Sequence, residues 1–160
     1  MWLENDGSIL QGLQIGNTSD NYYAGQGEFD PGEDISVCKV TAYLDYVAGD
    51  ITGKTFYCQI YTMSGTSLDV LQGESDGVTG SNAWLSGPVD FEFSTSVDLS
   101  NGTDYCIVIT MKEIDGGNYA RTTFTTAKTG FDGGYGRWKL GKTRQVWYGP
   151  YDFKCIIYTD

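Results

Sequence analysis

The chain of 160 residues contains no histidine. Histidine is the commonest general base in enzymes and the commonest side-chain ligand of metals. Its absence excludes Ser-His-Asp and Cys-His catalytic arrangements, together with zinc sites that use histidine. Glutamate is also scarce, and its six copies mostly fall in predicted loops or on solvent faces, so spacing gives no carboxylate pair for glycoside hydrolysis. We therefore expect a protein that is not an enzyme.

Positive charge is scarce as well, with 10 Lys and Arg against 21 Asp and Glu and a net charge of −11. The densest basic run is Arg137, Lys139, Lys142 and Arg144. It is too short to neutralise a row of phosphates, so we expect neither nucleic acid nor an anionic membrane as a partner. No apolar run approaches the roughly 18 residues of a membrane-spanning helix.

The opening segment, residues 1–12, is acidic at its start and has no apolar centre, so it is not a signal peptide. We expect an extracellular, cell-surface or virion protein. Two origins stay open: a module excised from a larger secreted protein, or a chain made in the cytosol and built into a particle. The initial Met1 favours a full-length polypeptide.

The chain is instead rich in glycine, with 22 copies, and in tyrosine, with 12 copies, while long runs of helix-forming residues are missing. This composition favours short strands joined by tight turns within one domain. Turn signals such as Asn101-Gly102 separate the apolar segments. The predicted strands are 22–29, 35–47, 55–63, 70–74, 89–94, 104–112, 119–125, 135–140 and 153–159.

Apolar and polar residues alternate along several of these segments, which indicates strands with one buried face. The predicted buried sets are Cys38, Val40, Ala42 and Leu44; Phe56, Cys58 and Ile60; and Phe153, Cys155 and Ile157. The segment 104–112 is apolar on both faces, so we expect it at the centre of a covered sheet. The prediction is an all-β, two-sheet antiparallel sandwich of roughly eight to ten strands, wound as a jelly roll. Residues 21–160 form the domain, and residues 1–20 form an arm or an extra strand.

The order of these features resembles a jelly-roll-like accessory domain of the kind found in carbohydrate-binding modules, bacterial surface proteins and phage or viral structural proteins. The similarity covers residues 22–159 and is carried by the segments 29–32, 58–61 and 99–108 and by Ile35, Val40, Leu44, Gly53, Trp84, Phe91, Phe93, Asn118-Tyr119, Gly133-Gly134, Trp147 and Asp152-Phe153. It implies a module for recognition or display, because this fold hosts many roles. Four cysteines exceed the usual number, and residues 1–20 have no counterpart.

The four cysteines are Cys38, Cys58, Cys106 and Cys155, each in the middle of a predicted strand. No CxxC spacing occurs, which argues against zinc. Cysteine in such positions serves as a small buried apolar residue, and we favour free thiols over disulfides between neighbouring strands.

An aromatic cluster falls near the end of the chain, beside Gly149-Pro150. Flat rings on loops stack on the apolar face of a sugar, and arginine supplies planar donors to its hydroxyls. The alternative is packing across a hairpin or a subunit contact, where aromatics are equally enriched. The candidate residues are Trp138, Trp147, Tyr148, Tyr151 and Tyr135, with Arg137 and Arg144. We expect Trp84 to cover the edge of the core.

Acidic residues gather in one predicted turn and around the last strand. They are Asp30, Glu33 and Asp34, then Asp152 and Asp160. Such oxygens suit a structural Ca²⁺, although their spacing matches no EF-hand or glycine-rich calcium repeat. Solvated acidic turns are the alternative. No cofactor is required.

Two functions follow from this sequence. One is a non-catalytic surface module that binds a polysaccharide or surface glycan through exposed aromatics, in adhesion or recognition. The alternative is a structural subunit of a phage or viral particle or of an extracellular filament, which assembles with itself or docks on a virion.

Overall fold

The computed structural model describes residues 2–4, 9–15, 23–65, 67–85, 87–112, 117–125, 137–140, 144–147, 152–153 and 155–160. Within these residues the chain forms fourteen strands. They are β1 (Trp2–Glu4), β2 (Ile9–Ile15), β3 (Tyr23–Phe29), β4 (Ile35–Ala48), β5 (Thr55–Ser64), β6 (Ser67–Glu74), β7 (Val78–Thr79), β8 (Gly87–Leu99), β9 (Tyr105–Met111), β10 (Tyr119–Thr125), β11 (Arg137–Leu140), β12 (Arg144–Trp147), β13 (Asp152–Phe153) and β14 (Cys155–Thr159). Nine of them span five or more residues, and eight of these nine, all except β2, overlap predicted strands. No helix in the described part of the chain is long and apolar enough to cross a bilayer.

The first sheet is organised around β4, which is fourteen residues long. One edge of β4 pairs with β8. Its other edge pairs first with β14 and then, further along, with β10. Outside these strands, β1 pairs with β14, and β2 and β13 pair with β10, so the sheet has seven strands, all antiparallel where they pair.

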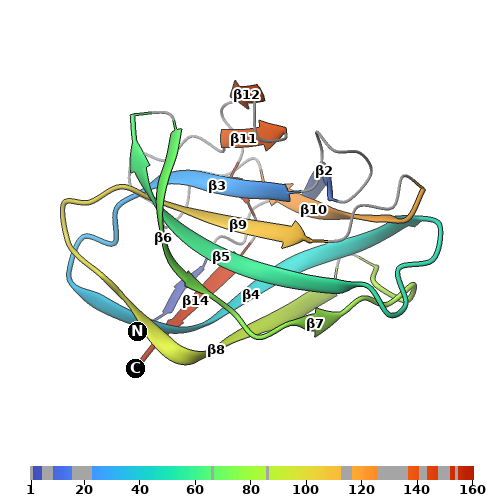
Figure 1. Ribbon diagram of the computed structural model, residues 1–160, viewed down its shortest axis with the longest axis horizontal. Coiled ribbons are helices and arrows are strands. Elements are labelled where there is room, and N and C mark those ends of the chain that lie inside the picture. Colours follow the sequence, from blue (N-terminus) through green and yellow to red (C-terminus); the bar gives the residue numbers. More distant parts are fainter. Residues whose placement is uncertain are drawn as a thin grey trace.

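The second sheet has the order β3-β9-β5-β6, with β7 also pairing with β5. All of its described pairings are antiparallel. Its centre is β9, in which every residue is buried. The two sheets lie face to face (Figure 1). The predicted fold class, an all-β two-sheet antiparallel sandwich, is confirmed; its jelly-roll winding stays a prediction.

Strands β11 and β12 pair only with each other and form a separate two-stranded ribbon in the described structure. The ribbon lies outside the sandwich, where β11 contacts β3, the edge strand of the second sheet (Figure 1). Only the backbone of the ribbon is described.

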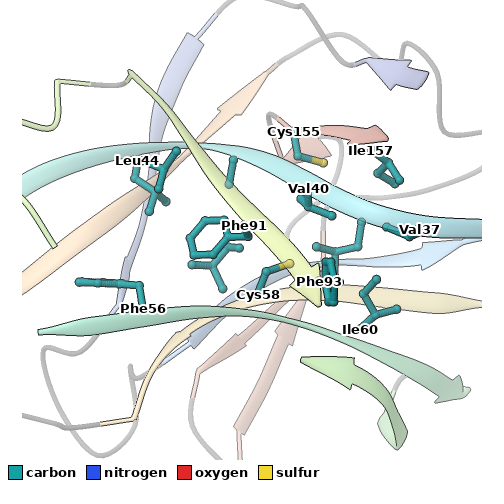
Figure 2. Close-up of a cluster of buried hydrophobic side chains, with 14 of the residues drawn as sticks. Val37, Val40, Leu44, Phe56, Cys58, Ile60, Phe91, Phe93, Cys155 and Ile157 are labelled. Carbon is teal, nitrogen blue, oxygen red and sulfur yellow. The ribbon is translucent and has the colours of Figure 1, made fainter. Parts of the chain in front are cut away.

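The core lies between β4 and β8 on one side and β5 and β9 on the other (Figure 2). Leu44, Phe56 and Phe91 are completely buried there, as is Ile60. Burying each large apolar side chain contributes about 1.5–3 kcal/mol, so this interior is the main source of stability. Trp84 packs against the core edge as expected, with its ring edge-on to Phe56 and centroids 5.1 Å apart.

Most of the predicted alternation is confirmed. Phe56, Cys58 and Ile60 are fully buried, and so are Cys155 and Ile157. The expectation that β9 is covered on both faces is also confirmed. For Phe153, only the backbone is described.

The placement of Cys38 in the buried set was wrong. Val37 is fully buried instead, and Cys38 is partly exposed. The β4–β14 ladder pairs Lys39 with Tyr158 but Val37 with Thr159, which leaves Cys38 as an extra residue. Such a β-bulge changes the phase of the alternation and turns the next side chain to the other face.

Hydrogen bonds connect the loops at one end of the sandwich. The backbone N–H of Asp50 donates to Asn118 Oδ1 (2.5 Å), and that of Ile51 donates to Asn82 Oδ1 (3.0 Å). Gly49 adopts a φ of 73° beside Asn118. A Cβ on Gly49 would lie 1.9 Å from Asn118 Oδ1 and 2.3 Å from the carbonyl oxygen of Gly117.

We predict that Gly49→Ala lowers the free energy of unfolding by about 3–5 kcal/mol, because backbone strain and a steric clash add together. Gly53→Ala is the matched control: Gly53 has a φ of 82° but nothing within 4 Å of the new Cβ. It should cost only about 1 kcal/mol of strain. Urea denaturation measures the free energy of unfolding of both variants. Equal losses in the two would show that the close approach of Asn118 and Gly117 to Gly49 does not contribute.

Candidate functional site

The β11–β12 ribbon carries four of the seven residues predicted to bind glycan. The register pairs Arg137 with Trp147 and Trp138 with Val146. The fourth residue, Arg144, pairs with Leu140. Tyr135, Tyr148 and Tyr151 lie outside the described residues, and of the ribbon residues only the backbone is described.

The register brings two of the predicted residues together and separates two others. Directly paired positions of an antiparallel ribbon share one face, and neighbouring positions along a strand alternate between faces. One face therefore has the positions Arg137, Lys139, Gln145 and Trp147, and the other has Trp138, Leu140, Arg144 and Val146. Trp147 and Arg137 share a face, whereas Trp138 and Trp147 occupy opposite faces.

Four of the five acidic residues predicted as calcium ligands, Asp30, Glu33, Asp34 and Asp160, lie at the opposite end of β4 from Gly49, whereas Asp152 lies in β13 and pairs with Thr125 of β10. Glu33, Asp34 and Asp160 line an open cavity of about 630 Å³ together with Asp98. Asp98 was missed by the sequence analysis. The signal available for it was the exposed half of the alternation in β8, where the neighbouring Val97 and Leu99 are buried.

Two of the four carboxylates that line the cavity, those of Asp98 and Asp160, each accept a hydrogen bond from a serine hydroxyl. Ser36 Oγ donates to Asp98 Oδ1 (2.5 Å), and Ser96 Oγ donates to Asp160 Oδ2. The backbone N–H of Asp160 also donates to the carbonyl oxygen of Ser36 (3.1 Å). These contacts tie Asp160, which follows β14, to β4 and, across β4, to β8.

Asp30 and Asp34 connect the turn before β4 to the turn before β9. Asp30 Oδ1 accepts from the backbone N–H groups of Gly32 (3.0 Å) and Gly102 (3.2 Å). Asp34 Oδ1 accepts from the N–H of Asn101 (2.8 Å). Both carboxylates therefore satisfy backbone donors in turns that have few other partners.

No group of three or more His, Cys, Asp or Glu side chains in the described part of the chain is arranged to hold a metal ion. The side chain of Asp152 lies outside the described residues. The calcium site with Asp30, Glu33, Asp34, Asp152 and Asp160 as ligands stays a prediction.

None of the four cysteines is joined in a disulfide, as favoured from the sequence. Burial raises the pKa of Cys58 well above its ordinary value, and nearby Cys155 and Cys106 add to the effect. Partial burial raises the pKa of Cys38, and a hydrogen bond with Asp160 adds to the effect. Thiols with raised pKa values are poor nucleophiles at neutral pH, so the fully buried Cys58 acts as a packing residue.

We predict that Asp30→Ala lowers the free energy of unfolding by about 1–2 kcal/mol, because two backbone donors lose their acceptor. Glu33→Ala, which removes a neighbouring exposed carboxylate, is the control and should change it by less than about 0.5 kcal/mol. Thermal and urea unfolding measure both. If Glu33→Ala lowers the free energy of unfolding as much as Asp30→Ala does, the effect comes from the net charge of the turn and not from the lost hydrogen-bond acceptor.

Comparison with protein-family models and with curated proteins finds no match to this chain.

Proposed function

We propose that the protein is a non-catalytic recognition module that binds a neutral polysaccharide on the Arg137–Trp147 face of the β11–β12 ribbon. The single observation that carries this proposal is the register of the ribbon, which pairs Trp147 with Arg137. An indole ring stacks on the apolar face of a pyranose, and a planar guanidinium donates to its hydroxyls.

The composition of the two ribbon faces supports this assignment. Lys139 and Gln145 accompany Trp147 and Arg137, so this face combines one ring with three hydrogen-bonding side chains. The opposite face has three apolar positions, Trp138, Leu140 and Val146, and one charged position, Arg144. An apolar face is the one expected to pack on the body of a protein, and a polar face is the one expected to meet solvent and ligand.

The position of the ribbon also supports a role in binding. It makes no strand pair with either sheet in the described structure. Segments that stand on a rigid scaffold without being part of it commonly carry binding residues. The net charge of −11 disfavours anionic polysaccharides, which is why the proposed ligand is neutral.

The experiment is affinity gel electrophoresis against a panel of neutral polysaccharides. We expect at least one of them to retard the wild type. Trp147→Ala and Arg137→Ala should each weaken that retardation by about ten-fold or more while leaving thermal stability unchanged. Trp138→Ala should instead lower the free energy of unfolding by about 3 kcal/mol, as for a packed tryptophan.

The control is Tyr158→Ala, which removes a partly exposed aromatic residue from β14 in the other sheet. The ring of Tyr158 lies 4.0 Å from Lys39 Nζ of β4, in the first sheet. Its removal should leave retardation intact. Absence of retardation on every neutral polysaccharide, or equal losses in Tyr158→Ala and Trp147→Ala, would refute the proposal.

A further inference from the structure

The turn before β9 contains the single Asn-Gly pair of the sequence, Asn101-Gly102. Both residues are exposed. Gly102 has a φ of 76°, and a Cβ built on it would meet nothing within 4 Å. The space around Gly102 is therefore open, and this residue has no side chain of its own to shield its backbone nitrogen from the preceding side chain.

The side chain of Asn101 differs from those of the two other asparagines in the described loops. It makes no hydrogen bond within the part of the chain that the structure describes. In Asn82 and Asn118, by contrast, the side-chain oxygen accepts a hydrogen bond from a backbone N–H. The residues that follow them, Ala83 and Tyr119, also carry side chains. The amide carbon of Asn101 is thus the one that a neighbouring backbone nitrogen can reach with least obstruction.

We propose that Asn101 is a site of spontaneous deamidation whose rate is limited by Asp30. The backbone nitrogen of Gly102 forms a bond to Cγ of Asn101, and the bond from Cγ to Nδ2 breaks. Nδ2 leaves as ammonia with the proton of the attacking nitrogen. The resulting five-membered succinimide adds water at one of its two carbonyl carbons and opens to aspartate or to isoaspartate. Water is the co-reactant, and no atom is oxidised or reduced.

Asp30 protects the site through its contact with the attacking nitrogen. Its Oδ1 accepts a hydrogen bond from the N–H of Gly102 at 3.2 Å. Attack requires this nitrogen to lose its proton, and a nearby carboxylate disfavours the negative charge that then develops. A carboxylate is also far too weak a base to remove the proton of an amide. The hydrogen bond therefore holds the N–H of Gly102 in its unreactive form.

Deamidation would change this turn in two ways. It adds a carboxylate beside Asp30 and Asp34, in a chain whose net charge is already −11. Isoaspartate also lengthens the main chain by one methylene group before Gly102, which displaces the N–H of Gly102 from Asp30. Both changes weaken the connection between the turn before β4 and the turn before β9. The modification thus makes the stability of this end of the sandwich depend on the age of the protein.

The test follows the full chain during prolonged incubation at neutral to mildly alkaline pH. Peptide mapping by mass spectrometry should show conversion of Asn101 to the two acids, while Asn82 and Asn118 stay intact. Labelling with an isoaspartyl methyltransferase identifies the isoaspartate. Asp30→Ala should accelerate the conversion about ten-fold or more, the factor expected from loss of one hydrogen bond to a charged acceptor.

Two variants control for charge and for stability. Glu33→Ala removes a carboxylate of the same turn that makes no hydrogen bond to Gly102, and Gly53→Ala lowers stability at a distant turn. Both should deamidate at the wild-type rate. A wild type in which Asn101 reacts no faster than the other two asparagines overturns the proposal. So does an Asp30→Ala rate equal to that of the wild type or of either control.

A second measurement tests the consequence for stability. Ion-exchange chromatography separates the aged, more acidic chain from the unmodified one, and urea denaturation then compares them. The aged chain should unfold at a lower urea concentration, and equal midpoints would show that the turn does not depend on Asn101. Neither Asn101 nor Asp30 lies in the ribbon, so this result is independent of glycan binding.

Discussion

Phe56 and Ile60 of β5 and Leu44 and Val40 of β4 meet in the interior of the sandwich, all fully buried (Figure 2). Among the described residues the other cluster of buried side chains is much smaller, with only Cys106 and Val108 at its centre. The contact between β4 and β5 therefore fixes how the sheets face each other.

This arrangement assigns different tasks to different parts of the molecule. The interior is closed and apolar, and burial raises the pKa of its Cys58 thiol well above the ordinary value. Polar residues concentrate in the turns at the two ends, where Asp30 and Asn118 satisfy backbone donors. The ribbon stands outside both sheets in the described structure and carries the face proposed above for ligand binding.

The sequence predicted those strands whose alternation is unbroken. In β5, Phe56, Cys58 and Ile60 follow a strict period of two, and the structure buries all three. In β4 the same reasoning placed Cys38 inside, because a bulge depends on the partner strand β14, which is distant in sequence. Strands β1 and β2 were anticipated only as an arm or one extra strand, since residues 1–20 have no sustained apolar period.

The candidate sites show the same limit, because they too depend on the pairing of strands that are distant in sequence. The aromatic cluster is visible in the sequence, but its division between two faces follows from the register of β11 and β12. Likewise, Glu33, Asp34 and Asp160 line one cavity, and Asp98, which the sequence did not suggest, reaches it from β8 through the pairing of that strand with β4. Composition identifies the residue types, and strand pairing decides which of them meet.

The two edges of β4 have consequences for the order in which the chain folds during synthesis. Its partner on one edge, β8, leaves the ribosome soon after it. The other edge pairs with β10 over residues 44–48 and waits for β14 over residues 37–42, where Tyr158 contacts Cys38 across 120 residues of chain. Until β14 is made, the peptide groups of β4 along that stretch have no strand partner on this edge. A nascent chain in this state is open to wrong pairing, so β14 completes this edge of β4.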